Sequence, residues 1–224
     1  MRLAGVIQAL ITLPLLLQTR LTNIPAFSLF YSLENELLRT VPGTTGTAMS
    51  PTATTLTTLL MSHASYFALG GTNAISSLDL SLAYNGIASY NGPLVGLLLF
   101  IGNWAGPIWW SLAGLEAVLP TNNEFTQAED DTSKESTAES PSAATKNMQA
   151  RSERTAEAYI EHTTLLTLFL ACATLATMAA CAVLRTHLFV WTVFSPKFLY
   201  AVAWLVGWHW FVNGVLGGIL VALD

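Results

Sequence analysis

Charged residues are scarce in this sequence. Asp, Glu, Lys and Arg together make up 10% of the 224 residues, whereas a soluble domain has about a quarter. The few basic residues are scattered, which excludes the clustered positive charge that nucleic-acid binding requires. Apolar residues make up 52% of the chain, so the composition is typical of a protein that resides in a membrane.

Cysteine and metal-ligand clusters are also lacking. Cys172 and Cys181 lie on opposite faces of one predicted helix, roughly 13 Å apart along its axis, and cannot form a disulfide with each other. His63, His162 and His187 are isolated and show no ligand spacing, so we expect no metal site in this chain.

Three apolar runs are long enough to cross a membrane as helices, which takes about 20 residues. They extend over residues 93–119, 163–184 and 198–223. Shorter runs at 3–17, 24–38 and 56–69 fit a tilted, re-entrant or interfacial helix as well as a span. The predicted fold is therefore all-α, a polytopic membrane bundle of about five helices.

The composition divides the chain into three parts. Residues 1–119 hold the first membrane helices and a polar segment at 66–92, and residues 159–224 hold two carboxy-terminal membrane helices. Between them, residues 120–158 are rich in acids, Ser, Thr and Ala and almost free of large apolar side chains. We expect this stretch to be a solvated, disordered loop.

The polar segment at 66–92 predicts a broken helix. Gly70 and Gly71 would end one helix, and Ser76 with Asp79 reads as a capping box that starts the next. Broken helices in membranes expose backbone groups, and transporters use them to hold polar substrates. The candidates for contact with a lipid headgroup in this segment are Asn73, Ser76, Ser77, Asp79, Tyr84 and Asn85.

Asp79 is the only acidic residue between Glu36 and Glu116. An unpaired carboxylate at the bilayer centre costs about 3 kcal/mol on insertion scales. Asp79 is therefore expected to cap a helix, to pair with a base or to bind a ligand. Helix capping and a grip on the amine or hydroxyls of a lipid headgroup both stay open.

In the last apolar run, His209 and Asn213 are four residues apart and share one helix face. Because lipid offers no hydrogen bonds, both should point into the bundle. A structural hydrogen bond between helices and contact with a polar headgroup are the two interpretations.

Two Gly-x-x-x-Gly pairs, Gly102 with Gly106 and Gly214 with Gly218, predict seams where a neighbouring helix approaches closely. Pro107 removes a backbone donor within its run, so a kink is expected there. Asn103, one turn earlier, could bond a freed carbonyl.

Three stretches in a fixed order carry a family resemblance: FALGGTNAISSLDLSLAYNG, NWAGPIWWSLA and LRTHLFVWTVFSPKFLYAVAW. They resemble the carboxy-terminal membrane region of the GPI ethanolamine phosphate transferases, most closely the type that modifies the second mannose. The resemblance extends from about Asn23 to the end, and the acidic loop is its divergent part.

The resemblance implies a multi-pass enzyme of the endoplasmic-reticulum membrane that moves phosphoethanolamine from phosphatidylethanolamine to a mannose of the GPI precursor glycolipid. Catalysis in the family belongs to an amino-terminal domain with a threonine nucleophile and zinc-binding Asp and His residues. This sequence contains no such domain. We therefore assign it no catalytic residue, expect zinc only in the missing domain, and expect a fragment, a truncated gene model or a split protein.

The role expected for the chain is to position the glycolipid and phosphatidylethanolamine. A small membrane partner subunit is a further expectation. Two other hypotheses remain at the sequence level: a stand-alone lipid or solute transporter, and a noncatalytic subunit that stabilises a membrane partner.

Overall fold

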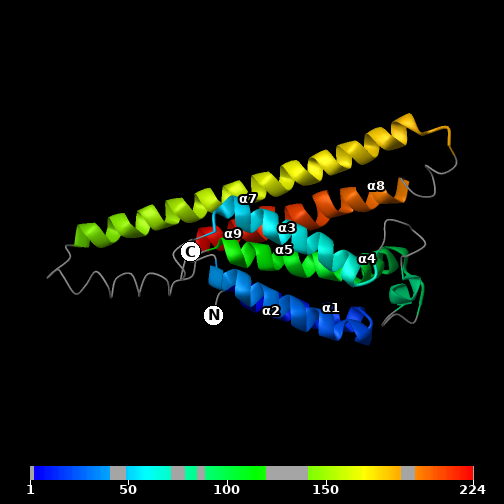
Figure 1. Cartoon of the computed structure of the whole chain (residues 1–224), viewed down its shortest axis with the longest axis horizontal. Coiled ribbons are helices and arrows are strands. Elements are labelled where there is room, and N and C mark those ends of the chain that lie inside the picture. Colours follow the sequence, from blue (N-terminus) through cyan, green and yellow to red (C-terminus); the bar gives the residue numbers. More distant parts are fainter. Residues whose placement is uncertain are drawn as a thin grey trace.

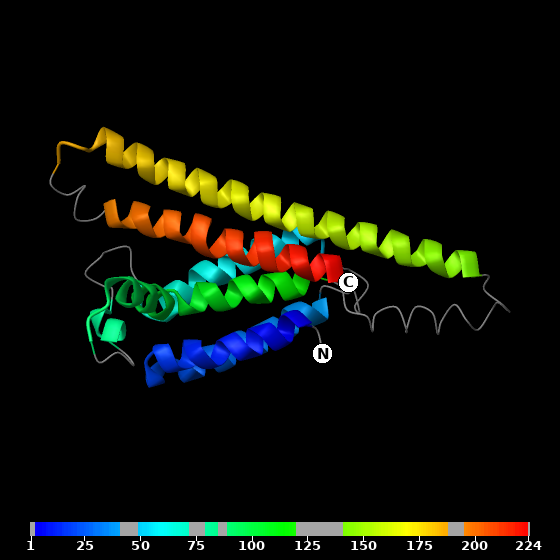
Figure 2. The same ribbon diagram turned by 180° about the vertical axis from the view of Figure 1, so that it is seen from behind.

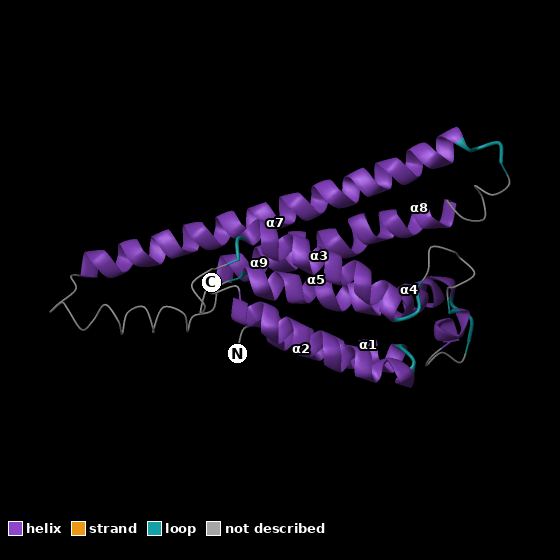
Figure 3. Cartoon of the chain, in the orientation of Figure 1, coloured by secondary structure: helices purple, strands orange, loops and turns teal. Residues whose placement is uncertain are grey.

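A computed structural model describes residues 3–40, 49–71, 79–84, 89–119, 141–187 and 195–223. Every element in these ranges is a helix, and none of them contains a strand (Figure 3). In chain order the helices are α1 (Leu3–Gln18), η1 (Leu21–Asn23), α2 (Ile24–Thr40), α3 (Pro51–Ala68), η3 (Leu80–Tyr84), α4 (Gly92–Asn103), α5 (Ala105–Val118), α7 (Pro141–Val183), α8 (Ser195–Val202), η5 (Ala203–Leu216) and α9 (Gly217–Leu223). The all-α prediction is confirmed.

The helices run up and down in one elongated bundle. Figures 1 and 2 show α1 and α2 along one side, α7 along the opposite side, and α5 between them. The helices alternate in direction, so that α1 and α3 both end close to the last residues of α4 (Figure 1). We call this the break end, because residues 79–84, a described part of the polar segment, lie there.

Among the described residues, two helices are long and apolar enough to cross a membrane, namely Ser152–Val183 within α7 and Phe198–Ala222 across α8, η5 and α9. The pair of α4 and α5 would make a third if it counts as one bent span. The sequence-based estimate of about five membrane helices is therefore only approximate. Apolar runs such as α1, with 16 residues, are too short to span a membrane on their own.

The predicted span at 93–119 is broken rather than continuous. The axes of α4 and α5 meet at an angle of 70° around Trp104. The kink was expected at Pro107, but Pro107 lies in the first turn of α5, where a helix needs no backbone donor. The break lies three residues before it, at Trp104. The Trp104 ring fills the bend and lies 5.1 to 6.3 Å from the rings of Tyr66, Phe100, Tyr200 and Trp204.

The core forms around α5, which is apolar on all sides, as expected for a helix enclosed by others. Ala105 and Ala113 are 0% exposed and Trp110 only 1%. Phe30 from α2 and Trp204 from η5 belong to the same cluster of buried side chains.

The first glycine pair faces two different neighbours. A β-carbon on Gly102 would lie 2.7 Å from Leu82 Cδ1, and one on Gly106 would lie 2.7 Å from Ser65 Oγ of α3. The break at Trp104 separates the two glycines, so each packs against its own partner.

At the second pair, Gly214 and Gly218, an added β-carbon would make only ordinary van der Waals contacts. A β-carbon on Gly214 would meet only Trp210 of its own helix, at 3.5 Å, and one on Gly218 would lie 3.8 Å from Tyr159 Oη. The close approach is at Gly217 instead, 2.6 Å from Tyr159 Cε2. The reason is that η5 is a π-helix, whose i→i+5 bonding turns its faces away from the α-helical spacing that the sequence pattern assumed.

The prediction of a disordered loop at 120–158 is wrong for its second half. Residues 141–158 are helical and form the start of α7, while 120–140 lie outside the described residues. After Pro141 the stretch has no Gly or Pro and is rich in Ala, Glu, Arg and Gln, which are strong helix formers. Continuity with the apolar half of α7 extends the helix further.

We predict that Gly106→Ala destabilises the bundle, because its methyl group would lie within 2.8 Å of both Oγ and Cβ of Ser65. Such overpacking costs about 1–3 kcal/mol. Gly96→Ala is the matched control, since nothing lies within 4 Å of a β-carbon there. Thermal unfolding in detergent should show a lower Tm for Gly106→Ala alone. Equal Tm values for the two variants would contradict the packing.

Candidate functional site

The polar segment is fastened at the break end by Asp79. Asp79 Oδ2 accepts hydrogen bonds from Arg20 Nε at 2.8 Å and lies 2.7 Å from Arg20 Nη2. Asp79 Oδ1 accepts bonds from the backbone N–H of Ser81 at 3.1 Å and from its hydroxyl at 2.6 Å. Asp79 thus caps the start of η3 and also pairs with a base, two of the three outcomes that the sequence left open.

Two amide side chains complete the attachment. Asn103 Oδ1 accepts the backbone N–H of Asp79 at 3.0 Å, and its Nδ2 donates to the carbonyl of Leu99 at 2.9 Å. Gln18, at the end of α1, donates to the carbonyl of Leu82 at 2.6 Å. The short helix η3 is therefore bound to both α1 and α4.

The charges at the break end are arranged so that the cation is the outer one. The Arg20 side chain is 68% exposed and that of Asp79 only 19%. The hydrogen bond from the Ser81 hydroxyl lowers the pKa of Asp79 below its usual 3.8, partial burial opposes this, and Arg20 adds to the lowering. An exposed guanidinium next to a membrane bundle can bind a phosphate group.

The other predicted contacts of this segment are only partly visible. Asn73, Ser76, Ser77 and Asn85 lie outside the described residues. Tyr84 ends η3, and only its backbone is described. Arg20 was not among the candidates, although a lone acid in a long apolar stretch signals that a base must lie nearby.

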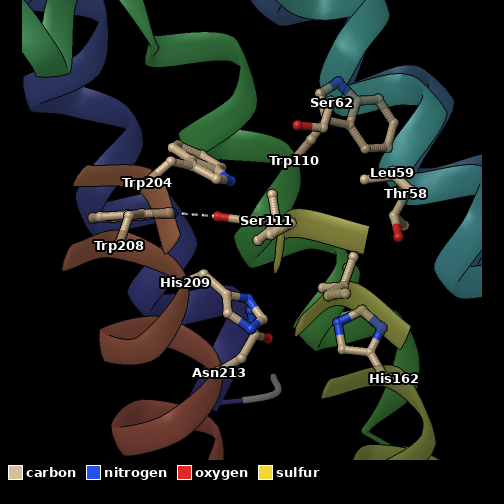
Figure 4. A pocket seen from close by; sticks show the side chains of 13 residues that line it. Thr58, Leu59, Ser62, Trp110, Ser111, His162, Trp204, Trp208, His209 and Asn213 are labelled. Atoms are coloured by element: carbon tan, nitrogen blue, oxygen red, sulfur yellow. Dashed lines mark hydrogen bonds between the residues drawn. The ribbon is translucent and has the colours of Figure 1, made fainter. Parts of the chain in front are cut away.

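The second predicted pair, His209 and Asn213, lies in a pocket between α3, α5, α7 and η5 (Figure 4). Asn213 Nδ2 lies 3.0 Å from His209 Nδ1, and His209 Nε2 lies 2.8 Å from Thr167 Oγ1 of α7. The His209 and Asn213 side chains are 6% and 1% exposed. They point into the bundle and link η5 to α7, as the structural interpretation requires.

His162 joins this pair across the pocket. Its ring is 1% exposed, and Nδ1 lies 2.9 Å from Thr55 Oγ1 of α3. The sequence analysis treated His162 as isolated, because 47 residues separate it from His209. Only the packing of α7 against η5 brings the two imidazoles to one pocket (Figure 4).

The polar lining of the pocket comprises Thr58, Ser62, Ser111, His162, His209 and Asn213. Ser111 Oγ accepts a hydrogen bond from Trp208 Nε1 at 2.6 Å, which the dashed line in Figure 4 marks. The pocket has a volume of about 410 Å³, its opening included. No Asp, Glu, Lys or Arg belongs to the described lining.

The described ranges contain no group of three or more His, Cys, Asp or Glu side chains arranged to hold a metal ion. These residues therefore do not fit a zinc ion, which the resemblance implies for a different domain.

These features define the chain as a polytopic helical membrane bundle with polar sites at one end and in its interior. Residues 1–224 match the family described as the GPI ethanolamine phosphate transferase membrane region. The chain belongs to this family.

Curated relatives are named GPI ethanolamine phosphate transferase 2. The Aspergillus oryzae protein is 42% identical over 209 residues, which cover 93% of this chain and 20% of the relative. The Yarrowia lipolytica protein is 32% identical over 97% of this chain and 26% of its own length. The Saccharomyces cerevisiae protein is 34% identical over 96% of this chain and 23% of its own length. The chain thus spans about a fifth to a quarter of their length. No solved structure matches it.

We predict that Thr167→Val destabilises the bundle by about 0.6–1.7 kcal/mol, the range for hydrogen bonds between membrane helices, because His209 Nε2 loses its partner. Thr174→Val is the matched control, since Thr174 bonds only the carbonyl of Leu170 in its own helix. A double-mutant cycle with His209→Phe should recover the difference as a coupling energy. No coupling would mean that the bond adds nothing.

We predict that Asp79→Asn loosens η3. The lowered pKa means that the carboxylate stabilises the folded state above its ordinary pKa of 3.8, and that this contribution is lost as pH falls through the folded value. The protection factor of the Ser81 amide in hydrogen exchange should stay level from neutral pH down to about pH 4 and then fall. In Asp79→Asn it should be lower and level throughout. Unchanged protection in the variant would contradict the cap.

Proposed function

We propose that this chain is the lipid-positioning part of a GPI ethanolamine phosphate transferase of the endoplasmic-reticulum membrane. In this proposal the enzyme moves phosphoethanolamine from phosphatidylethanolamine to the second mannose of the GPI precursor. The phosphorus–oxygen bond to the lipid glycerol breaks, a new one forms to a mannose hydroxyl, and diacylglycerol leaves with the proton that the mannose gives up. A zinc-binding domain outside this sequence performs the transfer.

The match of the whole chain to the family's membrane region carries this proposal. The geometry at the break end supports it, because the exposed guanidinium of Arg20 is held in place by Asp79 beside an apolar bundle. Both lipids of the reaction carry phosphate groups, and the proposal places the break end at their level in the membrane. Fixing one phosphate there would orient the reacting lipid and lower the entropic cost of bringing the two together.

The relatives bear the transferase name, so the transporter hypothesis is not favoured. Asp79 is engaged by Arg20 and Ser81, so its role in the proposal is to orient Arg20. A direct grip of Asp79 on an amine would require it to give up one of these partners. Lipid contacts of the remaining sequence candidates, and a small membrane partner subunit, belong to the proposal as well.

The test is a chimera in which this chain replaces the matching segment of the Saccharomyces cerevisiae relative. It should restore phosphoethanolamine transfer to a yeast strain that lacks that enzyme, measured on isolated GPI precursors. We predict that Arg20→Gln raises the KM for lipid about tenfold, since a charge-assisted bond worth over 1 kcal/mol is lost. Arg39→Gln is the control, because the Arg39 side chain is about as exposed as that of Arg20 and pairs with Glu36 within α2.

Protein abundance should stay unchanged in both variants. A chimera that accumulates in the membrane but transfers nothing would refute the proposed function. A normal KM for Arg20→Gln would refute the role of the break end.

A further inference from the structure

The interior pocket contains two buried hydrogen-bond acceptors without a well-formed bond. His162 Nε2 and Asn213 Oδ1 form no hydrogen bond of good geometry, although the two side chains lie close enough to interact with each other, and both residues are 1% exposed. Figure 4 shows the two side chains on facing sides of the pocket, with His209 beside Asn213. A buried polar atom without a bond costs about as much as a lost hydrogen bond, so a ligand that supplies donors would be stabilised here.

The surrounding bonds fix which atoms carry hydrogens. The hydroxyl of Thr55 already donates to the carbonyl of Pro51 at 2.8 Å, so it accepts from His162 Nδ1. The uncharged ring of His162 then has a bare Nε2.

The same logic holds at the second imidazole. Thr167 donates its hydroxyl to the carbonyl of Thr163 at 2.6 Å, so it accepts from His209 Nε2. His209 Nδ1 therefore accepts from Asn213 Nδ2, and the Asn213 Oδ1 atom is left facing the pocket. Both of these atoms are acceptors, whereas the other unpartnered atom of the lining, Trp110 Nε1, is a donor.

The rest of the lining favours a cation. Trp110, Trp204 and Trp208 line the pocket, and indole is the aromatic side chain that attracts cations most strongly. Trp204 also lies 5.1 Å from Trp104, ring centre to ring centre, in the bend of α4 and α5. The aromatic lining therefore continues to the break end, where Arg20 is placed to hold a phosphate.

A group with several N–H donors and a positive charge suits the two acceptors and the faces of the indole rings. A hydroxyl donates only one hydrogen and could serve one acceptor. A primary ammonium donates three, so it reaches both His162 Nε2 and Asn213 Oδ1 and also benefits from the indoles. The enclosed part of the pocket, about 30 Å³, has room for a group of the size of an ammonium, which is close to that of a water molecule.

We propose that this pocket binds the primary ammonium group of a membrane lipid. Both the ethanolamine of phosphatidylethanolamine and the glucosamine of a GPI precursor offer that group, so this inference rests on the proposed function for the choice of lipids. His162 and Asn213 accept from the ammonium, and Thr55, Thr167 and His209 position them.

The experiment compares lipids that differ only in N–H donors. The full chain, purified in detergent, is mixed with equal amounts of phosphatidylethanolamine and phosphatidylcholine, and the retained lipids are counted by native mass spectrometry. We predict a preference of about tenfold for phosphatidylethanolamine, because the quaternary ammonium of phosphatidylcholine has no N–H and two bonds are lost. Glucosaminyl-phosphatidylinositol and its N-acetylated form are the second pair of lipids. If the chain prefers the free amine in this second pair and shows no preference in the first, the site belongs to the glycolipid.

His162→Leu and Asn213→Leu should abolish the preference. His63→Leu is the matched control, since His63 bonds only the carbonyl of Leu59 in its own helix and does not line the pocket. Equal retention of both members of each pair by the wild-type chain would refute the site, whether or not the variants fold. A preference that survives both pocket substitutions would refute it too. Since retention needs no catalysis, an inactive chimera would leave this result standing.

Discussion

The close approach of α3 to α5 is the contact on which the rest of the bundle depends. Gly106 and Gly114 leave room for Ser65 and Thr58, whose atoms would lie 2.7 and 3.2 Å from added β-carbons. In a membrane, helices associate through such close packing rather than through the hydrophobic effect. The approach also places Thr55 of α3 beside His162 of α7. The geometry of the pocket therefore depends on two glycines of α5, although the imidazoles are bonded by side chains of α3, α7 and η5.

The bundle accommodates polar groups in an apolar environment in two different ways. At the break end, Asp79 and Arg20 keep their charges because they pair with each other and retain contact with the exterior. In the interior, threonine hydroxyls bond His162 and His209, the Asn213 side chain bonds His209, and the described pocket lining contains no Asp, Glu, Lys or Arg. The first arrangement suits an anionic group outside the bundle, and the second suits a donor that enters it.

Much of the architecture could be predicted from the sequence, for reasons that are local. Apolar runs predict helices whatever surrounds them, and His209 with Asn213 had to point inward because lipid offers no partner. Asp79 had to be capped or paired for the same reason. The sequence predicted a kink at Pro107, but the bend lies at Trp104, where an aromatic cluster from four helices surrounds it. The π-helical turn of η5 escaped prediction, because it removes the 3.6-residue periodicity that the glycine pattern assumed.

The sequence by itself determined that this chain is a membrane bundle of the transferase family, with a polar interruption at 66–92 and a buried His209–Asn213 pair. Only the tertiary structure decided that Arg20 is the partner of Asp79 and that His162 faces Asn213. These pairs are 59 and 51 residues apart. Spacing along a chain predicts neighbours on one helix, whereas contacts between helices depend on how side chains of many residues fit together in space.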